Sequence, residues 1–556
     1  MTQYVAIAVL VLTSWVFLRL RGRKSVLANL PGPPVTSWFF GNLQEFFDRH
    51  CWDYRTQYER QYGRLSKLNA LFGGTWIHVW DTKALHAIFV KDQDHYLEPM
   101  LTMQILIGPG LFATEGEQHR RQRRMLNPVF STRHLRGMIP LFYSVTGQVC
   151  DAIAQRIRRH SGGRGNTAEV DMLSWMGRTT LEIIGQVGFG STFDDFTSDE
   201  PDEFRTAIKS FFPEMMKSIL IRVFLPILVH IGTPAFRRRV VELIPLESVQ
   251  RIRHISDVLH ERSVRIFAEK KAALAKGDEA LKHEIGEGQD IMSILLRENV
   301  MASREDKLPD DELIAQIALR AEFLQTVEAE GDGATLDFDR LMELPYLEAV
   351  CRESFRVYPS VTCLFREATK DMILPLSEPI RMLDGSFISS LPAPKGTRLI
   401  TNLAACNVDP VLWGLDASEW KPGRWLEPLP KAVEEARVPG IYSHMYVLFI
   451  RFPVQEPRSN AGGFAPQDDV PKREQGLHVS LKCLSREMQQ ADTLCRSGFK
   501  FAQIELKVVL FVLLQRFRFE PTGEPIAWNS APAQYPTVGK VSEDPALPLK
   551  VTLLDA

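Results

Sequence analysis

The chain has no closely spaced pair of cysteines and no excess of charge of either sign, and each absence excludes a class of protein. Its seven cysteines are scattered and form no Cys-x-x-Cys pair, which argues against a disulfide framework or a zinc site and favours a reducing compartment. The 66 Lys and Arg residues nearly balance the 68 Asp and Glu residues, for a net charge of -2. This balance lacks the basic surface of a nucleic-acid-binding protein, so we expect no nucleic-acid partner.

Charge is also absent from an apolar run near the N-terminus, from Tyr4 to Leu18, and four basic residues follow between positions 19 and 24. A secretory signal would carry its positive charge before the run and a cleavage site after it. With its uncharged neighbours the run approaches the ~17–25 residues of a spanning helix. We therefore predict a single-pass membrane anchor over residues 1–24, with everything after it on the cytoplasmic side. A buried N-terminal helix is the alternative.

The remaining residues, 25–556, are predicted to form a mainly α fold with a small β-sheet region. A stiff Leu-Pro-Gly-Pro-Pro break at 30–34 separates them from the anchor. Amphipathic periodicity predicts helices over Leu135 to Ile157, Leu173 to Val187 and Val249 to Lys276, and short strands at Trp76 to Trp80 and Arg398 to Ile400.

One apolar segment, residues 211–236, fits either the core or a surface that dips into a bilayer. Of these two interpretations, we expect the core.

The stretch from Leu344 to Pro359 places Glu353 and Arg356 one helical turn apart. Most Glu and Arg pairs at this spacing are solvated surface pairs, contributing roughly 0.2–0.5 kcal/mol. Other short patterns surround this pair in one order along the chain, however, and they favour a functional interpretation.

A basic stretch from Thr114 to Phe130 is the first of these patterns. Thr114 and Glu117 form a possible capping box for a helix that would run up to Asn127 and Pro128. On that helix His119 and Arg123, at i and i+4, share a face and suit two neighbouring anionic groups. A basic, solvated helix surface is the alternative.

Four further patterns follow the Glu353 and Arg356 pair: Phe365 to Thr369, Pro394 to Thr397, Asn407 to Pro410 and Trp420 to Trp425. Together with the earlier patterns, their order resembles that of the cytochrome P-450 haem-thiolate monooxygenases, and most closely the fungal membrane-bound members. The resemblance extends from Pro31 to roughly the end of the chain, with two breaks.

The resemblance implies a cytochrome P-450-like fold, haem b as cofactor and electrons from NADPH through a membrane-bound reductase. It directs His119, Arg123 and Arg366 to the haem propionates. It also implies a buried structural cluster of Glu353, Arg356 and Arg424, although Gly423 stands where a Glu is usual. We expect a monomer at the endoplasmic reticulum membrane that oxidises a hydrophobic small molecule, for example a terpenoid in fungal secondary metabolism.

Both breaks in the resemblance fall on the chemistry, so the predicted fold is incomplete. At the first break the family has a long helix across the haem, which carries an acid-threonine pair, and a further helix after it. This chain has room for only one helix before the next motif, and Thr326 is its only threonine between Asp310 and Gly331. We therefore predict a deletion near residues 316–321. Residues 446–494 have no family counterpart, and we predict a foreign insertion there. One hypothesis explains both breaks: a piece of coding sequence is omitted at the predicted deletion, and a piece of noncoding sequence is translated at the predicted insertion.

The predicted insertion ends beside the expected haem ligand. Gly498 to Glu505 resembles the start of the helix that follows the ligand loop. In the family the ligand cysteine stands two residues before this glycine, but this chain has Arg496 there. Cys495 lies one residue too early and is not preceded by the Gly and Arg of the family's loop. Cys495 is therefore either the axial thiolate of a rebuilt loop or an ordinary free cysteine. The functional alternatives to a monooxygenase are a catalytically impaired or inactive membrane-tethered relative and a haem-dependent isomerase or dehydratase.

Overall fold

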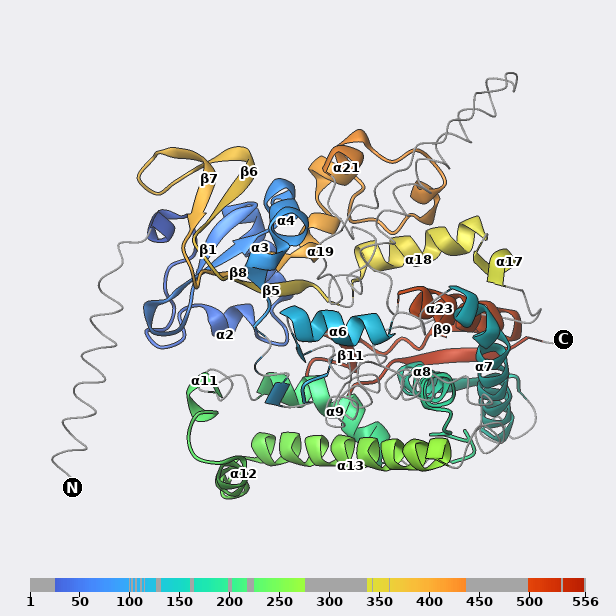
Figure 1. Cartoon of the computed structure of the whole chain (residues 1–556). Coiled ribbons are helices and arrows are strands. Elements are labelled where there is room, and N and C mark those ends of the chain that lie inside the picture. The colour runs from blue at the N-terminus through green and yellow to red at the C-terminus, as the bar shows by residue number, and fades with distance from the viewer. Residues whose placement is uncertain are drawn as a thin grey trace, which may run out of the picture. The chain divides into compact units, whose positions relative to one another are not determined.

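The computed structural model describes residues 26–99, 101, 104–105, 108–110, 113–114, 116–126, 132–160, 165–198, 203–217, 225–275, 338–342, 344–359, 361–436, 499–531 and 534–554. The chain divides into two compact units, each built from two separate stretches (Figure 1). Unit 1 consists of Met1–Pro99 and Glu353–His444, and unit 2 of Met100–Arg352 and Met445–Ala556. The predicted anchor at 1–24, deletion near 316–321 and insertion at 446–494 all lie outside the described residues.

Unit 1 is built around a five-stranded sheet in the order β1-β2-β8-β5-β3, in which only β2 and β8 are parallel. The strands are β1 (Leu65–Asn69), β2 (Thr75–Val79), β3 (Tyr96–Leu97), β5 (Cys363–Ala368) and β8 (Arg398–Asn402), and a hairpin adds β6 (Met372–Arg381) and β7 (Phe387–Ala393). The two predicted strands are confirmed as β2 and β8. Phe46 and Tyr58 pack with Leu68 and Ile400 in a small core, which joins the first helices to the sheet.

The helices of unit 1 are short. They are α2 (Leu43–Phe46), α3 (Trp52–Tyr62), α4 (Thr82–His86), α19 (Leu403–Asn407), α20 (Pro410–Trp413) and α21 (Lys431–Ala436), with a 3-10 turn, η8 (Pro422–Trp425). Helix α18 (Pro345–Val357) crosses the sequence boundary between the two units.

Unit 2 is mainly helical, as predicted. Its helices include α6 (Gly116–Leu126), α7 (Thr132–His160), α8 (Met172–Phe189), α9 (Glu203–Lys217), α13 (Glu247–Ala275), α17 (Phe338–Met342) and α23 (Phe499–Arg516). Helices α7, α8 and α13 confirm the three predicted amphipathic stretches, and α13 packs along α9 (Figure 1). A three-stranded sheet in the order β4-β12-β9 and a β10-β11 hairpin complete the unit, with β4 (Thr167–Asp171), β9 (Phe517–Pro521), β10 (Ile526–Asn529), β11 (Tyr535–Val538) and β12 (Pro548–Leu553).

Helix α23 lies in the core of unit 2 and packs along α7. Its apolar residues are spread around the whole helix rather than along one stripe, a pattern typical of a buried helix. Two charged side chains nevertheless lie within it, since Glu505 and Lys507 are 1% and 0% exposed. Both ionisable groups therefore have to be accommodated inside the core.

The prediction that residues 211–236 belong to the core is correct only for the first part of the segment. Phe211 and Met215 on α9 are buried, whereas Ile231 and Phe236 are about half exposed, at 49% and 51%. The second part lies on the short helices α11 (Leu225–Leu228) and α12 (Pro234–Glu242), where apolar composition alone did not indicate which side chains would find a packing partner.

Among the residues that the structure describes, no helix is both long enough and apolar enough to cross a membrane.

The buried carboxyl of Glu505 generates a prediction on stability. In the described part of the chain neither of its oxygens has a hydrogen-bond partner, and burial raises its pKa from 4.5 to about 8, with the nearby Thr180 hydroxyl opposing the rise. The folded protein then keeps a proton that the unfolded chain loses, so stability should fall as pH rises from about 4.5 to about 8. Glu505→Gln should remove this part of the pH dependence and be more stable than the wild type at pH 8, by up to about 4 kcal/mol.

Denaturant unfolding of both proteins at pH 5 and pH 8 measures this difference, with Glu524→Gln as an exposed control in the same unit. Parallel pH dependences for the wild type and Glu505→Gln would contradict the prediction.

Candidate active site

The structure brings Glu353, Arg356 and Arg424 together in unit 1. The fully buried Glu353 carboxylate accepts five hydrogen bonds. Oε1 accepts from Arg356 Nη2 (2.8 Å), the Lys421 backbone N–H (2.8 Å) and Arg424 Nε (3.2 Å). Oε2 accepts from Arg356 Nε (2.8 Å) and Trp425 Nε1 (3.0 Å). One carboxylate on α18 thus fixes both ends of η8.

Arg356 is as completely matched as its carboxylate partner. A guanidinium has five N–H donors, and besides the two bonds to Glu353 this one donates to the backbone carbonyls of Asn407 (2.7 Å), Ala417 and Glu419 (3.1 Å). All five donors therefore have an acceptor. Because a buried ion pair is tolerated only when its remaining donors and acceptors are satisfied, this geometry explains how the pair can be 0% exposed.

Electrostatics keep Glu353 ionised. Burial alone would raise the pKa of this carboxyl, but the hydrogen bonds from Arg356, the Lys421 N–H and Arg424 outweigh it and hold the pKa below the ordinary value. Arg424 is shared with Asp416, whose Oδ1 lies 3.3 Å from Nη1. Its position does not require a side chain at Gly423, the place where the family usually has a Glu.

Arg366 lies on β5, with its side chain 5% exposed. Its Nη1 is 3.1 Å from Glu98 Oε2 and also donates to the Phe365 carbonyl at 2.6 Å, while the guanidinium stacks 5.2 Å from the centre of the Phe89 ring. The strand and the ring hold the cation in a fixed place. A buried cation of this kind fits a carboxylate such as a haem propionate.

His119 is also buried, on α6 in unit 2. The backbone of Arg123 lies one turn further along the same helix, and its side chain is outside the described residues. The helix begins at Gly116, two residues after Thr114, the residue that the sequence predicted as its cap. The Thr114 hydroxyl donates to Gln122 Oε1 at 2.8 Å.

Arg366 and His119, each taken within its own unit, are donors of the kind that can hold a carboxylate such as a haem propionate. Arg366 supplies a buried cation and His119 a buried imidazole, in units 1 and 2 respectively. The predicted iron ligand, Cys495, lies outside the described residues. The fit therefore concerns the propionates and not the iron.

Sequence reasoning missed five participants in the Glu353 cluster: the Lys421 backbone N–H, the Trp425 indole and the carbonyls of Asn407, Ala417 and Glu419. A backbone group carries no sequence signal. Trp425 lies in a motif that drew attention only through Arg424. Its indole N–H needs a hydrogen-bond partner when buried, and this requirement was the one signal in the sequence that could have indicated its place in the cluster.

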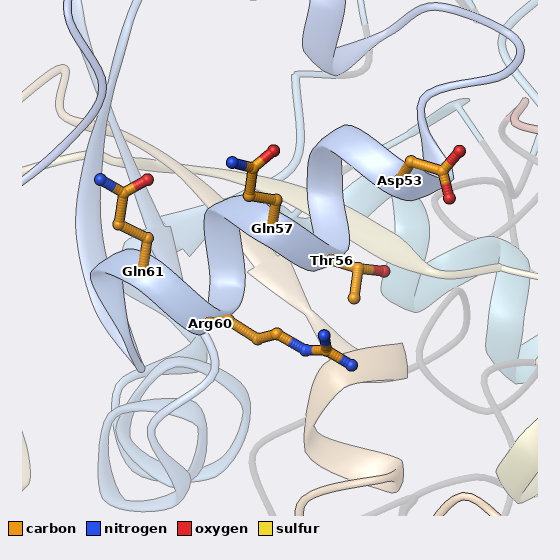
Figure 2. A pocket seen from close by; sticks show the side chains of 5 residues that line it. All are labelled: Asp53, Thr56, Gln57, Arg60 and Gln61. Carbon is orange, nitrogen blue, oxygen red and sulfur yellow. The ribbon is translucent and has the colours of Figure 1, made fainter.

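A pocket also lies along one face of α3, lined by Asp53, Thr56, Gln57, Arg60 and Gln61 (Figure 2). All five lining residues come from this one helix and are exposed. The pocket shares no residue with the charge cluster, and nothing in its lining indicates catalysis.

Comparison with known proteins places this fold and charge cluster in a family. The family model described as Cytochrome P450 matches residues 31–319 and 314–437. Cytochrome P450 monooxygenase 91 of Postia placenta is 41% identical, over 97% of this chain and 96% of that protein. Ganoderic acid synthetase CYP5150L8 of Ganoderma lucidum is 39% identical, over 96% and 95% respectively.

The chain therefore belongs to the cytochrome P450 family of haem-thiolate monooxygenases, and the family assignment made from the sequence is confirmed. Enzymes of this family carry haem b and receive electrons from a reductase.

The Glu353 cluster generates a second prediction on stability. Glu353→Gln and Arg356→Ala should each lower the free energy of unfolding by about 3–5 kcal/mol, because either change leaves buried polar groups without their counter-charge. Arg398→Ala, which removes the exposed pair with Glu367, should cost less than about 1 kcal/mol. Denaturant unfolding measures all three variants, and a cost below about 1 kcal/mol for Glu353→Gln would contradict the structural role of the cluster.

Proposed function

We propose that the gene encodes a membrane-bound monooxygenase that inserts one oxygen atom into a hydrophobic small molecule of the terpenoid class. The observation that carries this proposal is the 39% identity, over nearly the full length of both chains, to a protein named ganoderic acid synthetase. Ganoderic acid is a terpenoid, and oxidised terpenoids are products of fungal secondary metabolism. Electrons come from NADPH through a reductase, and the enzyme acts as a monomer.

His119, Arg123 and Arg366 would hold the two propionates of haem b. Two guanidinium groups and an imidazole supply N–H donors of the kind that two carboxylates accept from. When bound, the haem supplies an iron centre that activates dioxygen for transfer to the substrate. Glu353, Arg356 and Arg424 take no part in the chemistry and keep the surrounding segments in place.

The proposed location is the endoplasmic reticulum membrane, with residues 1–24 as a single anchor and the two units on the cytoplasmic side. Besides the apolar run near the N-terminus, exposed apolar side chains on unit 2 support this proposal. Between positions 228 and 246 these are Leu228, Ile231, Phe236, Val240, Leu243 and Leu246. Contact with a bilayer would remove this apolar surface from water.

The departures from the family pattern support a second proposal, that this chain is a catalytically impaired product of an altered gene model. The two stretches that match the family model meet at residues 314–319, beside the proposed deletion, and the second ends at 437, shortly before the proposed insertion at 446–494. Sequencing the transcript across both places tests the idea. A transcript that encodes the chain as it stands would contradict it.

The thiolate generates a third prediction. Propionate donors can still dock a haem, but Cys495 is displaced by one residue in a loop without its usual Gly and Arg, so the sulfur should not reach the iron. The reduced, carbon-monoxide-treated chain should lack the long-wavelength Soret band of thiolate ligation, and Cys495→Ala should change the spectrum little. A strong thiolate-type band that Cys495→Ala abolishes would overturn this prediction and make Cys495 the ligand.

The same experiment on a chain with both junctions repaired tests the proposed activity. The repaired protein should show the thiolate band and, with NADPH and a reductase, should convert a terpenoid to a product that carries one added oxygen atom. Haem binding with a normal thiolate band but no turnover of any terpenoid would contradict the substrate class while leaving the enzyme class intact.

The anchor generates a fourth prediction. The full-length chain should sediment with membranes after high-salt and carbonate washes, because the apolar run is costly to leave in water. Deletion of the residues before Pro31 should shift a large part of the protein to the supernatant. A full-length chain that is already soluble after both washes would rule out the anchor.

A further inference from the structure

Arg366 has a carboxylate partner within its own unit, and the pairing of two strands places it there. Strands β3 and β5 are antiparallel, with Leu97 opposite Glu367. The next step of this register sets Glu98 opposite Arg366, and residues directly opposite each other in an antiparallel pair have Cβ atoms about 4.5–5.5 Å apart. The ion pair between Glu98 Oε2 and Arg366 Nη1, at 3.1 Å, is therefore a consequence of the sheet register.

Two further contacts orient the Arg366 guanidinium independently of this ion pair. Its Nη1 donates to the Phe365 carbonyl at 2.6 Å, and the guanidinium lies 5.2 Å from the centre of the Phe89 ring. The bond to Glu98 is longer than the bond to the carbonyl, and the Glu98 side chain is more exposed than that of Arg366, at 18% against 5%. Of these three contacts, the ion pair is the one that can be removed while the other two still hold the cation.

A haem propionate bound by Arg366 would be a second carboxylate on the same cation. A guanidinium has five N–H donors and can bind more than one carboxylate. Two carboxylates that share a site nevertheless oppose each other's charge. Because the backbone of Glu98 is held beside β5, its carboxylate remains near the cation that the propionate needs. The register of the sheet therefore imposes a like charge on this propionate.

We propose that Glu98 is a positioning residue, which acts on the haem through Arg366 by competing with a propionate for this guanidinium. Glu98 supplies a counter-charge to the buried cation while no propionate is bound, and it weakens haem binding when a propionate takes the same cation. This inference rests on the proposed function, since it assumes that Arg366 holds a propionate. All the residues that carry it belong to unit 1.

The substitution Glu98→Gln keeps the size of the side chain and removes its charge, and its two effects should have opposite signs. Without haem, the variant should unfold at a lower denaturant concentration than the wild type, because the buried cation loses this counter-charge. With haem, the propionate no longer meets a like charge at Arg366, so the variant should bind haem about fivefold more tightly.

Titration of ferric haem into the apoprotein of the full chain, followed by Soret absorbance, measures the affinities. It is carried out at a temperature where far-UV circular dichroism shows every variant folded. The matched control is Glu367→Gln, which removes the same charge from the exposed pair with Arg398 on the same sheet and should bind haem as the wild type does.

The dimethyl ester of haem is the second probe, because esterification removes the charge of both propionates. Glu98→Gln and the wild type should bind the ester with equal affinity. A role of Glu98 that is merely structural would instead change the affinities for haem and for its ester alike.

A haem affinity of Glu98→Gln within about twofold of the wild type would overturn the inference, and so would an equal gain for haem and for the ester. Arg366→Met separates this inference from the proposed function. If that variant binds haem as tightly as the wild type, or if the wild type shows no saturable haem binding, the proposed role of Arg366 is contradicted and the inference fails with it.

Discussion

The structure of unit 1 depends on a carboxylate that is buried and still charged. Glu353 keeps its charge because five hydrogen bonds converge on it, two of them from Arg356. The remaining donors of Arg356 then impose positions on the backbone at 407, 417 and 419. A loop-rich segment is thereby given a single conformation, since any other would leave a buried charge unmatched.

Helix α18 carries a second ion-paired carboxylate five residues earlier, with a side chain that is 21% exposed, and it is satisfied within unit 2. Glu348 pairs with Lys507 and Glu353 with Arg356, so in each unit α18 supplies the carboxylate of an ion pair whose cation is fully buried. Neither pair needs to contribute net stability relative to apolar residues of the same volume. Each can supply specificity instead, because it penalises every arrangement in which its partners are displaced.

Periodicity predicted the elements well where side chains repeat over several turns, as in α7, α8 and α13. It could not predict the burial of Glu353 and Arg356, because their i and i+3 spacing is the same in a solvated pair and a buried one. Only the order of the surrounding motifs favoured the second interpretation. Arg424 was found through that order, and the carbonyl acceptors of Arg356 could not be found at all, since their sequence identity is irrelevant to the bond.

Two other features show what a single sequence leaves open. Lys507 was overlooked because a lysine two residues beyond the motif from Gly498 to Glu505 carries no sign of its distant partner, Glu348, more than a hundred residues away. The segment at 225–236 was assigned to the core on its composition, but composition does not show whether a packing partner exists. Both outcomes depend on contacts between stretches that lie far apart in the chain.

The central claim is that the Glu353 carboxylate holds the segment around η8 in place, and hydrogen exchange followed by mass spectrometry tests it most directly. The reporter is the peptide that contains the Lys421 amide, which donates to Glu353 Oε1. In Glu353→Gln this peptide should exchange markedly faster than in the wild type, while peptides from α23 in the other unit change little. Unchanged exchange at residues 416–426 would contradict the claim, because the segment would then be held by something other than this carboxylate.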